Sequence, residues 1–325
     1  MAKRPIIVIT ASSLGCFFKC PRQYYLSYVC GWRKRVADDS LRFGTAFHKG
    51  LEEWFKGTPA NAAVFEAIAT AGDAQEFDAE TVMQLKALLN GYFAKWEGAI
   101  DAKVMPEREF AVKFQFLRGC IVCGKIDGIV EYADGHKGII EHKTTSEAIG
   151  PMDDYWQTIN RDQVALYKAA AQKEGIDVTE VLYDVIRKPT IHLGKNETPD
   201  EYGSRLANDC IGAANGENPR YKDYKRGADF YFARRTIPLL STDMDALARR
   251  LFVFKKIYDT MNRCAKSIVA DGGNEIDAYP KCGSSMVCKT CPFRGGVCNS
   301  SELPEDSWEK GRMFEELTVA KKYLA

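Results

Sequence analysis

The chain has 325 residues, of which 46% are hydrophobic and 27% are charged, so it can bury a sizeable core as one large domain or two small ones. The formal net charge of +1 excludes a strong global field, so nucleic-acid binding would need a local basic face. The apolar run Ile6 to Ile9 is too short for a signal peptide, and no apolar stretch is long enough to span a membrane. We therefore expect a cytoplasmic location, where the eleven cysteines serve metal binding or core packing.

The first part of the chain predicts a short strand followed by helices. Residues Ile6 to Trp32 begin with a β-like run and continue with aromatic residues at mixed helical spacing. From Leu41 to Phe55, apolar residues recur every four positions, which is typical of one face of a helix. Asp78 to Trp96 is predicted to form the next helix.

The middle of the chain predicts strands. Glu109 to Tyr132 and Gly138 to Thr145 are rich in Val, Ile and Phe, and the turn residues Ala133-Asp134-Gly135 lie between them, which indicates a hairpin. Asp162 to Ala171 has helical spacing, and Glu180 to Arg187 is apolar like another strand. This order favours a mixed α/β sheet with helices packed against it.

We expect a single domain spanning residues 1–325 with a core at about residues 36–190. Residues 195–240 are less regular and rich in charges, with Pro and Gly, and are expected to form an insertion. Leu247 to Met261 is predicted to be a helix. Cysteines concentrate at the two ends, in residues 12–32 and 280–300.

Three charged residues lie in the two strands of the predicted hairpin. Residues two apart on a strand share a face, so Glu141 and Lys143 point one way and His142 the other. Asp127 can lie beside them on the adjoining strand. Two such carboxylates are costly to bury unless a divalent cation or a basic group neutralises them, and Lys143 is suited to activating a water molecule beside a phosphate. Ordinary ion pairs on a solvent-facing strand are the alternative.

Three further residues fit the same chemistry. Gln163 and Tyr167 are four residues apart on one predicted helix face, where both could reach a phosphate or the lysine. His48 lies in an earlier predicted helix, and imidazole is a competent ligand for Mn²⁺. Taken singly, each of the three also fits a residue at the edge of a core.

Together these residues carry a family resemblance. The ordered set, which runs from about Ser12 to Cys298 with the cysteines included, resembles the RecB-type branch of the PD-(D/E)XK nucleases, similar to CRISPR-associated exonucleases and phage recombination nucleases. The set consists of His48, Asp127, Glu141-His142-Lys143 and Gln163-x-x-x-Tyr167. The resemblance implies a restriction-endonuclease-like fold, in which helices flank a mixed β-sheet core.

The resemblance also implies a role for each residue. Mg²⁺ or Mn²⁺ would be bound by four groups: the side chains of His48, Asp127 and Glu141 and the backbone carbonyl of His142. Lys143 would position the attacking water. Gln163 and Tyr167 would support the DNA or the lysine.

The cysteines near the C-terminus form a close group, Cys288-x-x-Cys291-Pro292-Phe293-x4-Cys298. Their spacing fits either zinc or an iron-sulfur cluster. The RecB-type resemblance implies a [4Fe-4S] cluster with Cys20, in the sequence Cys20-Pro21-Arg22, as the fourth ligand. Cys282 could replace Cys288 as a ligand. The implied role is a structural clasp between the two ends of the chain.

Two later segments interleave aromatic and basic residues, Tyr221 to Arg226 and Phe230 to Arg235. Surfaces that stack bases and pair phosphates have this composition. Acidic neighbours dilute the charge, so we prefer a solvated loop followed by a strand whose aromatic side chains face inward.

The resemblance implies a metal-dependent DNA nuclease, a hydrolase that acts as an exonuclease on single-stranded or end-containing DNA. Its setting would be bacterial, archaeal or phage, with recombination or CRISPR adaptation proteins as candidate partners. One alternative is a non-catalytic DNA-binding or complex-forming subunit with the same fold. A zinc-stabilised regulator is the other.

Overall fold

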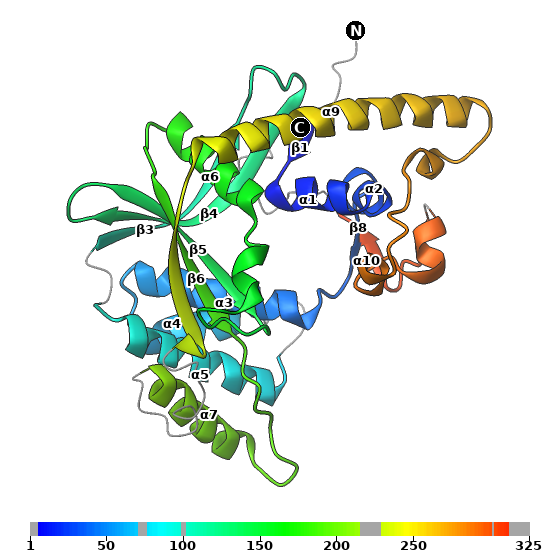
Figure 1. Ribbon diagram of the computed structural model, residues 1–325. Coiled ribbons are helices and arrows are strands. Elements are labelled where there is room, and N and C mark those ends of the chain that lie inside the picture. The colour runs from blue at the N-terminus through cyan, green and yellow to red at the C-terminus, as the bar shows by residue number, and fades with distance from the viewer. Residues whose placement is uncertain (1–5, 71–76, 99–101, 215–228, 301, 312–325) are drawn as a thin grey trace.

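A six-stranded mixed sheet forms the centre of the molecule, with helices on both faces (Figure 1). The computed structural model describes residues 6–70, 77–98, 102–214, 229–300 and 302–311. The sheet order is β1-β4-β5-β6-β7, and β3 also pairs with β4. The bounds are β1 Ile7–Ile9, β3 Ala102–Val112, β4 Cys120–Tyr132, β5 Lys137–Thr145, β6 Glu180–Arg187 and β7 Phe232–Pro238. The predicted mixed α/β sheet flanked by helices is confirmed.

The helices form two groups, each sharing an apolar core with the sheet. The first group is α1 Ala11–Lys19, α6 Arg161–Lys173 and α9 Ser241–Ala270. The second group is α3 Asp39–Phe55, α4 Ala60–Ala69, α5 Ala79–Trp96 and α7 Pro199–Ala214. On α3 the predicted spacing holds, because Phe43, Phe47 and Leu51 are all buried. Within the described ranges, none of the helices combines the length and apolar character that a membrane crossing requires.

Strand β4 has different partners on its two edges. β3 pairs with one edge along residues 122–132 of β4. On the other edge, β1 runs parallel to residues 120–122 and β5 runs antiparallel to residues 128–131. Between these two pairings, residues 123–127 have no strand partner on this edge within the described part of the chain. Side chains from other elements can therefore approach β4 here, where Asp127 lies.

The run predicted from Glu109 to Tyr132 is divided between two strands. β3 ends at Val112 and β4 begins at Cys120, with a turn between them that finishes at Gly119. Gly119 has a φ of 76°, in the left-handed region that favours glycine. The predicted hairpin of β4 and β5 is confirmed by their antiparallel pairing.

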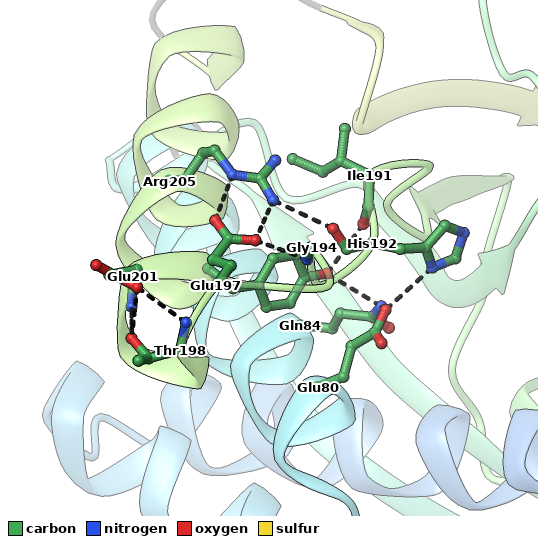
Figure 2. A network of polar contacts seen from close by, with 10 residues as sticks. Glu80, Gln84, Ile191, His192, Gly194, Glu197, Thr198, Glu201 and Arg205 are labelled. Atoms are coloured by element: carbon green, nitrogen blue, oxygen red, sulfur yellow. Dashed lines mark hydrogen bonds and ion pairs between the residues drawn. The ribbon is translucent and has the colours of Figure 1, made fainter.

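Residues 195–240 contain more regular structure than predicted, because this range includes α7 and β7. β7 pairs with β6 along its length, and α7 lies beside α5 (Figure 1). A polar network shown in Figure 2 fixes α7: Tyr202 accepts from Gln84 of α5 at 3.2 Å and donates to the carbonyl of Ile191 at 2.9 Å. Arg205 pairs with Glu197 through two bonds of 2.7 Å. Three of the charges in this range, Asp200, Glu201 and Arg205, lie at exposed positions of this helix.

The segment Phe230 to Arg235 passes from a turn into β7 at Phe232, so the strand preferred from the sequence is present but begins two residues later. Phe230, Tyr231 and Phe232 are buried. The companion segment, Tyr221 to Arg226, lies outside the described residues.

The two ends of the chain meet in a third apolar cluster beside the main sheet. A two-stranded antiparallel sheet joins β2 Trp32–Lys34 to β8 Trp308–Lys310. The cluster contains residues from the π-helix at Tyr25–Val29, which follows α2 Pro21–Tyr24, and from the C-terminal segments. Phe293 stacks on Trp308 with ring centroids 4.8 Å apart. The C-terminal segments include short helical turns at Glu275–Ala278, α10 Ser285–Lys289 and Gly295–Asn299.

Candidate active site

The predicted acids and lysine come together where β4 and β5 diverge. Their last paired residues are Gly128 and Ile140, immediately beside Asp127 and Glu141. Instead of continuing the ladder, the backbone N–H of His142 donates to Asp127 Oδ2 at 2.9 Å. The sequence predicted that the two acids lie on adjoining strands. The structure adds that the strands diverge here, which leaves room for Asp127 to reach the backbone of β5.

Glu141 is 1% exposed, and one of its oxygens has several partners. Lys143 forms an ion pair with Oε1, and Gln163 donates to the same oxygen at 2.7 Å. Gln163 also lies 2.7 Å from the hydroxyl of Tyr167, and its Oε1 accepts from Lys143 at 3.3 Å. Helix α6 therefore supplies the two predicted polar side chains to the site from one face.

Helix α3 brings His48 to the other acid. His48 Nδ1 lies 3.6 Å from Asp127 Oδ1, and its ring lies 5.9 Å from that of His142. The helix approaches β5 closely at Gly44, where an added Cβ would lie 3.3 Å from Thr144 Oγ1. A small residue at this position allows the approach that places His48 beside Asp127.

The two acids have pKa values displaced in opposite directions. Burial, with the neighbouring charge of Asp127, raises the pKa of Glu141 to about 7 against the opposing effect of Lys143. Burial would also raise the pKa of Asp127, but His48 and the backbone N–H of His142 hold it below its ordinary value. Burial alone would lower the pKa of His48, but Asp127 raises it above 6.5. The site therefore combines a permanently ionised acid with one that titrates near neutral pH.

A second polar network, which sequence reasoning missed, lies on the opposite face of β5. His142 Nδ1 is 2.9 Å from Asp184 Oδ2, and Arg234 donates to Asp184 Oδ1 at 3.2 Å. Tyr92 donates to Asp184 and accepts from Arg234 at 2.8 Å. Asp184 is fully buried. A charged residue inside an apolar strand was the signal in the sequence, because such a residue needs buried partners.

The donor set at the acids fits a divalent cation. Glu141 Oε2 is buried and has no hydrogen-bond partner among the described residues, which leaves an anionic oxygen free for a ligand. Carboxylate and carbonyl oxygens suit Mg²⁺ and Mn²⁺, and imidazole also suits Mn²⁺. Across the described ranges, no three His, Cys, Asp or Glu side chains converge as a formed metal group. Lys143 and His48 pair with the two acids in this arrangement.

The cysteines predicted as cluster ligands lie around one cavity of about 200 Å³. Its lining includes five thiols, those of Cys20, Cys282, Cys288, Cys291 and Cys298. The Sγ atoms of Cys282 and Cys288 are 3.9 Å apart. The structure thus brings together all four predicted ligands and the alternative one, and all eleven cysteines are free thiols.

Arg22 fastens the N-terminal wall of this cavity to the C-terminal segments. Its buried side chain donates to the carbonyl oxygens of Tyr279 at 2.6 Å and Cys298 at 3.2 Å. Asp277 lies 3.7 Å from the guanidinium. Because Arg22 is two residues after Cys20, the contact fixes this thiol relative to Cys298.

The site thus places Asp127 on β4 and the pair Glu141 and Lys143 on the adjoining strand β5. The sequence matches the PD-(D/E)XK nuclease superfamily over residues 8–299, and the chain belongs to this superfamily. Nucleases of this superfamily are hydrolases that generally use Mg²⁺ or Mn²⁺.

Solved structures give weaker similarities. A "Putative exonuclease" from Eubacterium rectale is 14% identical over 65% of this chain and 82% of its own, with a TM-score of 0.34. A protein named SSO0001 is 16% identical over 65% of this chain and 78% of its own, with a TM-score of 0.26. No curated protein matches the sequence. The family assignment therefore rests on the superfamily match.

Proposed function

We propose that this protein is a metal-dependent deoxyribonuclease that acts as an exonuclease on single-stranded or end-containing DNA. The observation that carries the proposal is the buried, unpartnered Oε2 of Glu141 beside Lys143, in a chain that belongs to a nuclease superfamily. The narrower RecB-type branch, with recombination or CRISPR-associated partners, stays a prediction from the sequence.

The residues would divide the work as follows. His48, Asp127, Glu141 and the backbone carbonyl of His142 would hold Mg²⁺ or Mn²⁺, which supplies Lewis-acid stabilisation and lowers the pKa of bound water. The Lys143 ammonium would orient the attacking water and stabilise charge on the phosphate. Gln163 and Tyr167 would hold Lys143 in place through the contacts they already make.

The test is cleavage of end-labelled linear DNA and of a circle, with Mn²⁺, by the wild type and by Lys143→Ala. Loss of one charge-stabilising group should lower the rate by about 100-fold or more. Lys137→Ala is the matched control, because Lys137 is on the same strand and pairs with Glu131, at 3.6 Å, outside the site. The circle should survive while the linear strand is degraded.

Unchanged cleavage by Lys143→Ala would contradict the assigned role. DNA binding by the wild type without cleavage under either metal would instead favour the non-catalytic subunit. Cleavage of the circle would reject the exonuclease assignment alone.

We also propose that Cys20, Cys288, Cys291 and Cys298 bind a [4Fe-4S] cluster, with Cys282 as the alternative to Cys288. The five thiols around one cavity support a metal centre there. Anaerobically purified protein should be brown, and iron and sulfide analysis should distinguish the cluster from zinc.

Single Cys282→Ser and Cys288→Ser variants separate the two ligand sets. The variant that removes a ligand should lose most of its iron and visible absorbance, whereas the other should retain both. Zinc without iron in the wild type would reject the cluster.

A further inference from the structure

A short loop, residues 150–158, connects the two elements that supply most of the active site. It follows β5, which carries Glu141 and Lys143, and precedes α6, which carries Gln163 and Tyr167. It ends in a 3₁₀ turn at Asp154–Thr158. Whatever this loop presents to solvent therefore lies at the rim of the site.

The sheet register anchors the loop on the face of Glu141. Glu141 is in register with Tyr183 of β6, which is in register with Arg235 of β7. Paired residues point to the same face, so the three side chains form one row that extends about 10 Å from β5 to β7. Arg235 is thus a fixed point on the active-site face.

Arg235 holds the loop in place through contacts with a side chain and with the backbone. Its guanidinium lies 4.0 Å from the centroid of the Trp156 ring and donates to the carbonyl of Pro151 at 2.6 Å. The Trp156 indole donates to the carbonyls of Ile149 at 3.1 Å and Gly150 at 3.0 Å. The loop is therefore held in place by hydrogen bonds to its backbone carbonyls and by the contact between Arg235 and the Trp156 ring.

Two side chains of this braced loop are placed to meet a substrate. Tyr155 is half-buried, and its hydroxyl interacts electrostatically with Lys143 and Glu141. Met152 is 94% exposed, the most exposed large apolar side chain among the described residues. A single exposed methionine is ordinary on a flexible surface. In this turn the N–H of Gly150 donates to the side chain of Asp153 at 2.7 Å, so Met152 projects from a backbone that a hydrogen bond holds in place.

We propose that the 150–158 loop is a nucleobase-binding subsite, in which Met152 packs against the base next to the cleaved bond while Tyr155 borders the phosphate. This inference rests on the proposed function and adds to it the part of the substrate that is recognised. Apolar side chains that insert against bases are a general mode of contact with nucleic acids, and stacking tolerates any base because each has a π-face.

The test measures binding without cleavage, by anisotropy of fluorescein-labelled single strands in EDTA. Each strand of the set carries one abasic site at a successive position. At one position, the missing base should weaken wild-type binding by about fivefold. Met152→Ala should weaken binding of the intact strand by the same factor and should not respond to that abasic site.

Met286→Ala is the matched control, because Met286 is 79% exposed and lies on α10 at the cysteine region. It should bind like the wild type. Arg235→Ala should reproduce the Met152→Ala result, because it removes the brace while the methionine remains. Full sensitivity to the abasic site in Met152→Ala, or an equal loss in Met286→Ala, would overturn the inference.

The result is separable from that of the nuclease assay. Cleavage by the wild type with no base-sensitive position rejects the subsite alone. A base-sensitive position without cleavage under Mn²⁺ rejects the nuclease and retains the subsite. Absence of both binding and cleavage rejects the two together.

Discussion

Glu141 and Asp127 are neighbours with different electrostatic environments. Asp127 has as its partners a backbone N–H and the imidazole of His48, whose pKa it raises. Glu141 is buried, and only one of its oxygens has a hydrogen-bond partner among the described residues. Ionising both acids at once is unfavourable because their charges repel. Without a cation, Glu141 is the acid that takes up the proton.

The raised pKa of Glu141 predicts how stability depends on pH in the metal-free protein. The protonated form is favoured by folding, so its contribution is fully present below the ordinary pKa of 4.5 and is lost as the pH rises through about 7. Asp127 has a lowered pKa and contributes in a separate window, below 3.8. In EDTA, the wild type should lose on the order of 2 to 3 kcal/mol across the Glu141 window.

Glu141→Gln is the control, because its amide has nearly the same shape and does not titrate. Denaturant unfolding at a series of pH values from 4.5 to 7 should show a steeper fall in stability for the wild type than for this variant, in which the raised pKa of His48 still contributes. Parallel curves for the two proteins would show that Glu141 titrates normally.

At the scale of elements, the buried network behind β5 joins three strands and one helix. Removing Asp184 would leave Arg234 as an uncompensated buried charge, which typically costs about 3 to 5 kcal/mol. We therefore expect Asp184→Ala to lower the free energy of unfolding by this amount. Chemical denaturation, followed by circular dichroism, measures it.

Glu197→Ala provides the comparison, because Glu197, just before α7, also forms an acid–arginine pair, and its partner Arg205 is exposed. Exposed pairs contribute little, so this variant should unfold at nearly the wild-type midpoint. Similar losses for both variants would show that burial does not govern the strength of the Asp184 network.

The strands and helices with strong periodicity were predictable from sequence, and those fixed by tertiary contacts were not. The hydrophobic repeat of α3 and the apolar runs of β4, β5 and β6 can be recognised directly in the sequence. Helix α7 is defined by its packing against α5, and strand β7 is defined by its pairing with β6. Local charge and turn composition therefore gave a misleading signal for both.

The same distinction applies to the candidate site. Glu141 and Lys143 share a face by the two-residue period alone, and both helical partners could be placed from their spacing. Asp184 and Arg234 become neighbours only through the β5-β6-β7 register. Register depends on which strands pair, and the pairing of β5, β6 and β7 could not be read from the sequence.

At the scale of the whole molecule, Arg22 links positions 276 residues apart by its bond to Cys298. Arg22→Met keeps the apolar stem but leaves the buried carbonyls of Tyr279 and Cys298 without their donor. Such a loss costs about 1 to 3 kcal/mol. A cost near the middle of that range should make local opening of residues 280–310 at least tenfold more frequent. Limited proteolysis with chymotrypsin should show this as faster cleavage in that segment.

Arg33→Met tests whether any arginine between the two ends would behave alike. Arg33 bonds Glu309 at 2.8 Å and joins the same two segments, but its side chain is 51% exposed. Its loss should leave the cleavage rate nearly unchanged. Equal acceleration in both variants would assign the effect to charge and not to the buried donor.

The small sheet of β2 and β8 also orders events during synthesis. Its first strand, at Trp32, is made early, but its partner at Trp308 is translated only after all the strands of the central sheet. Until then Tyr25, Leu26 and Trp32, which are buried in the finished protein, have no cover from that end. The central sheet can assemble first, since domains fold from the N-terminal side as the chain grows. The cysteine cavity is therefore expected to form after the central sheet, so any metal centre would be built onto strands that are already paired.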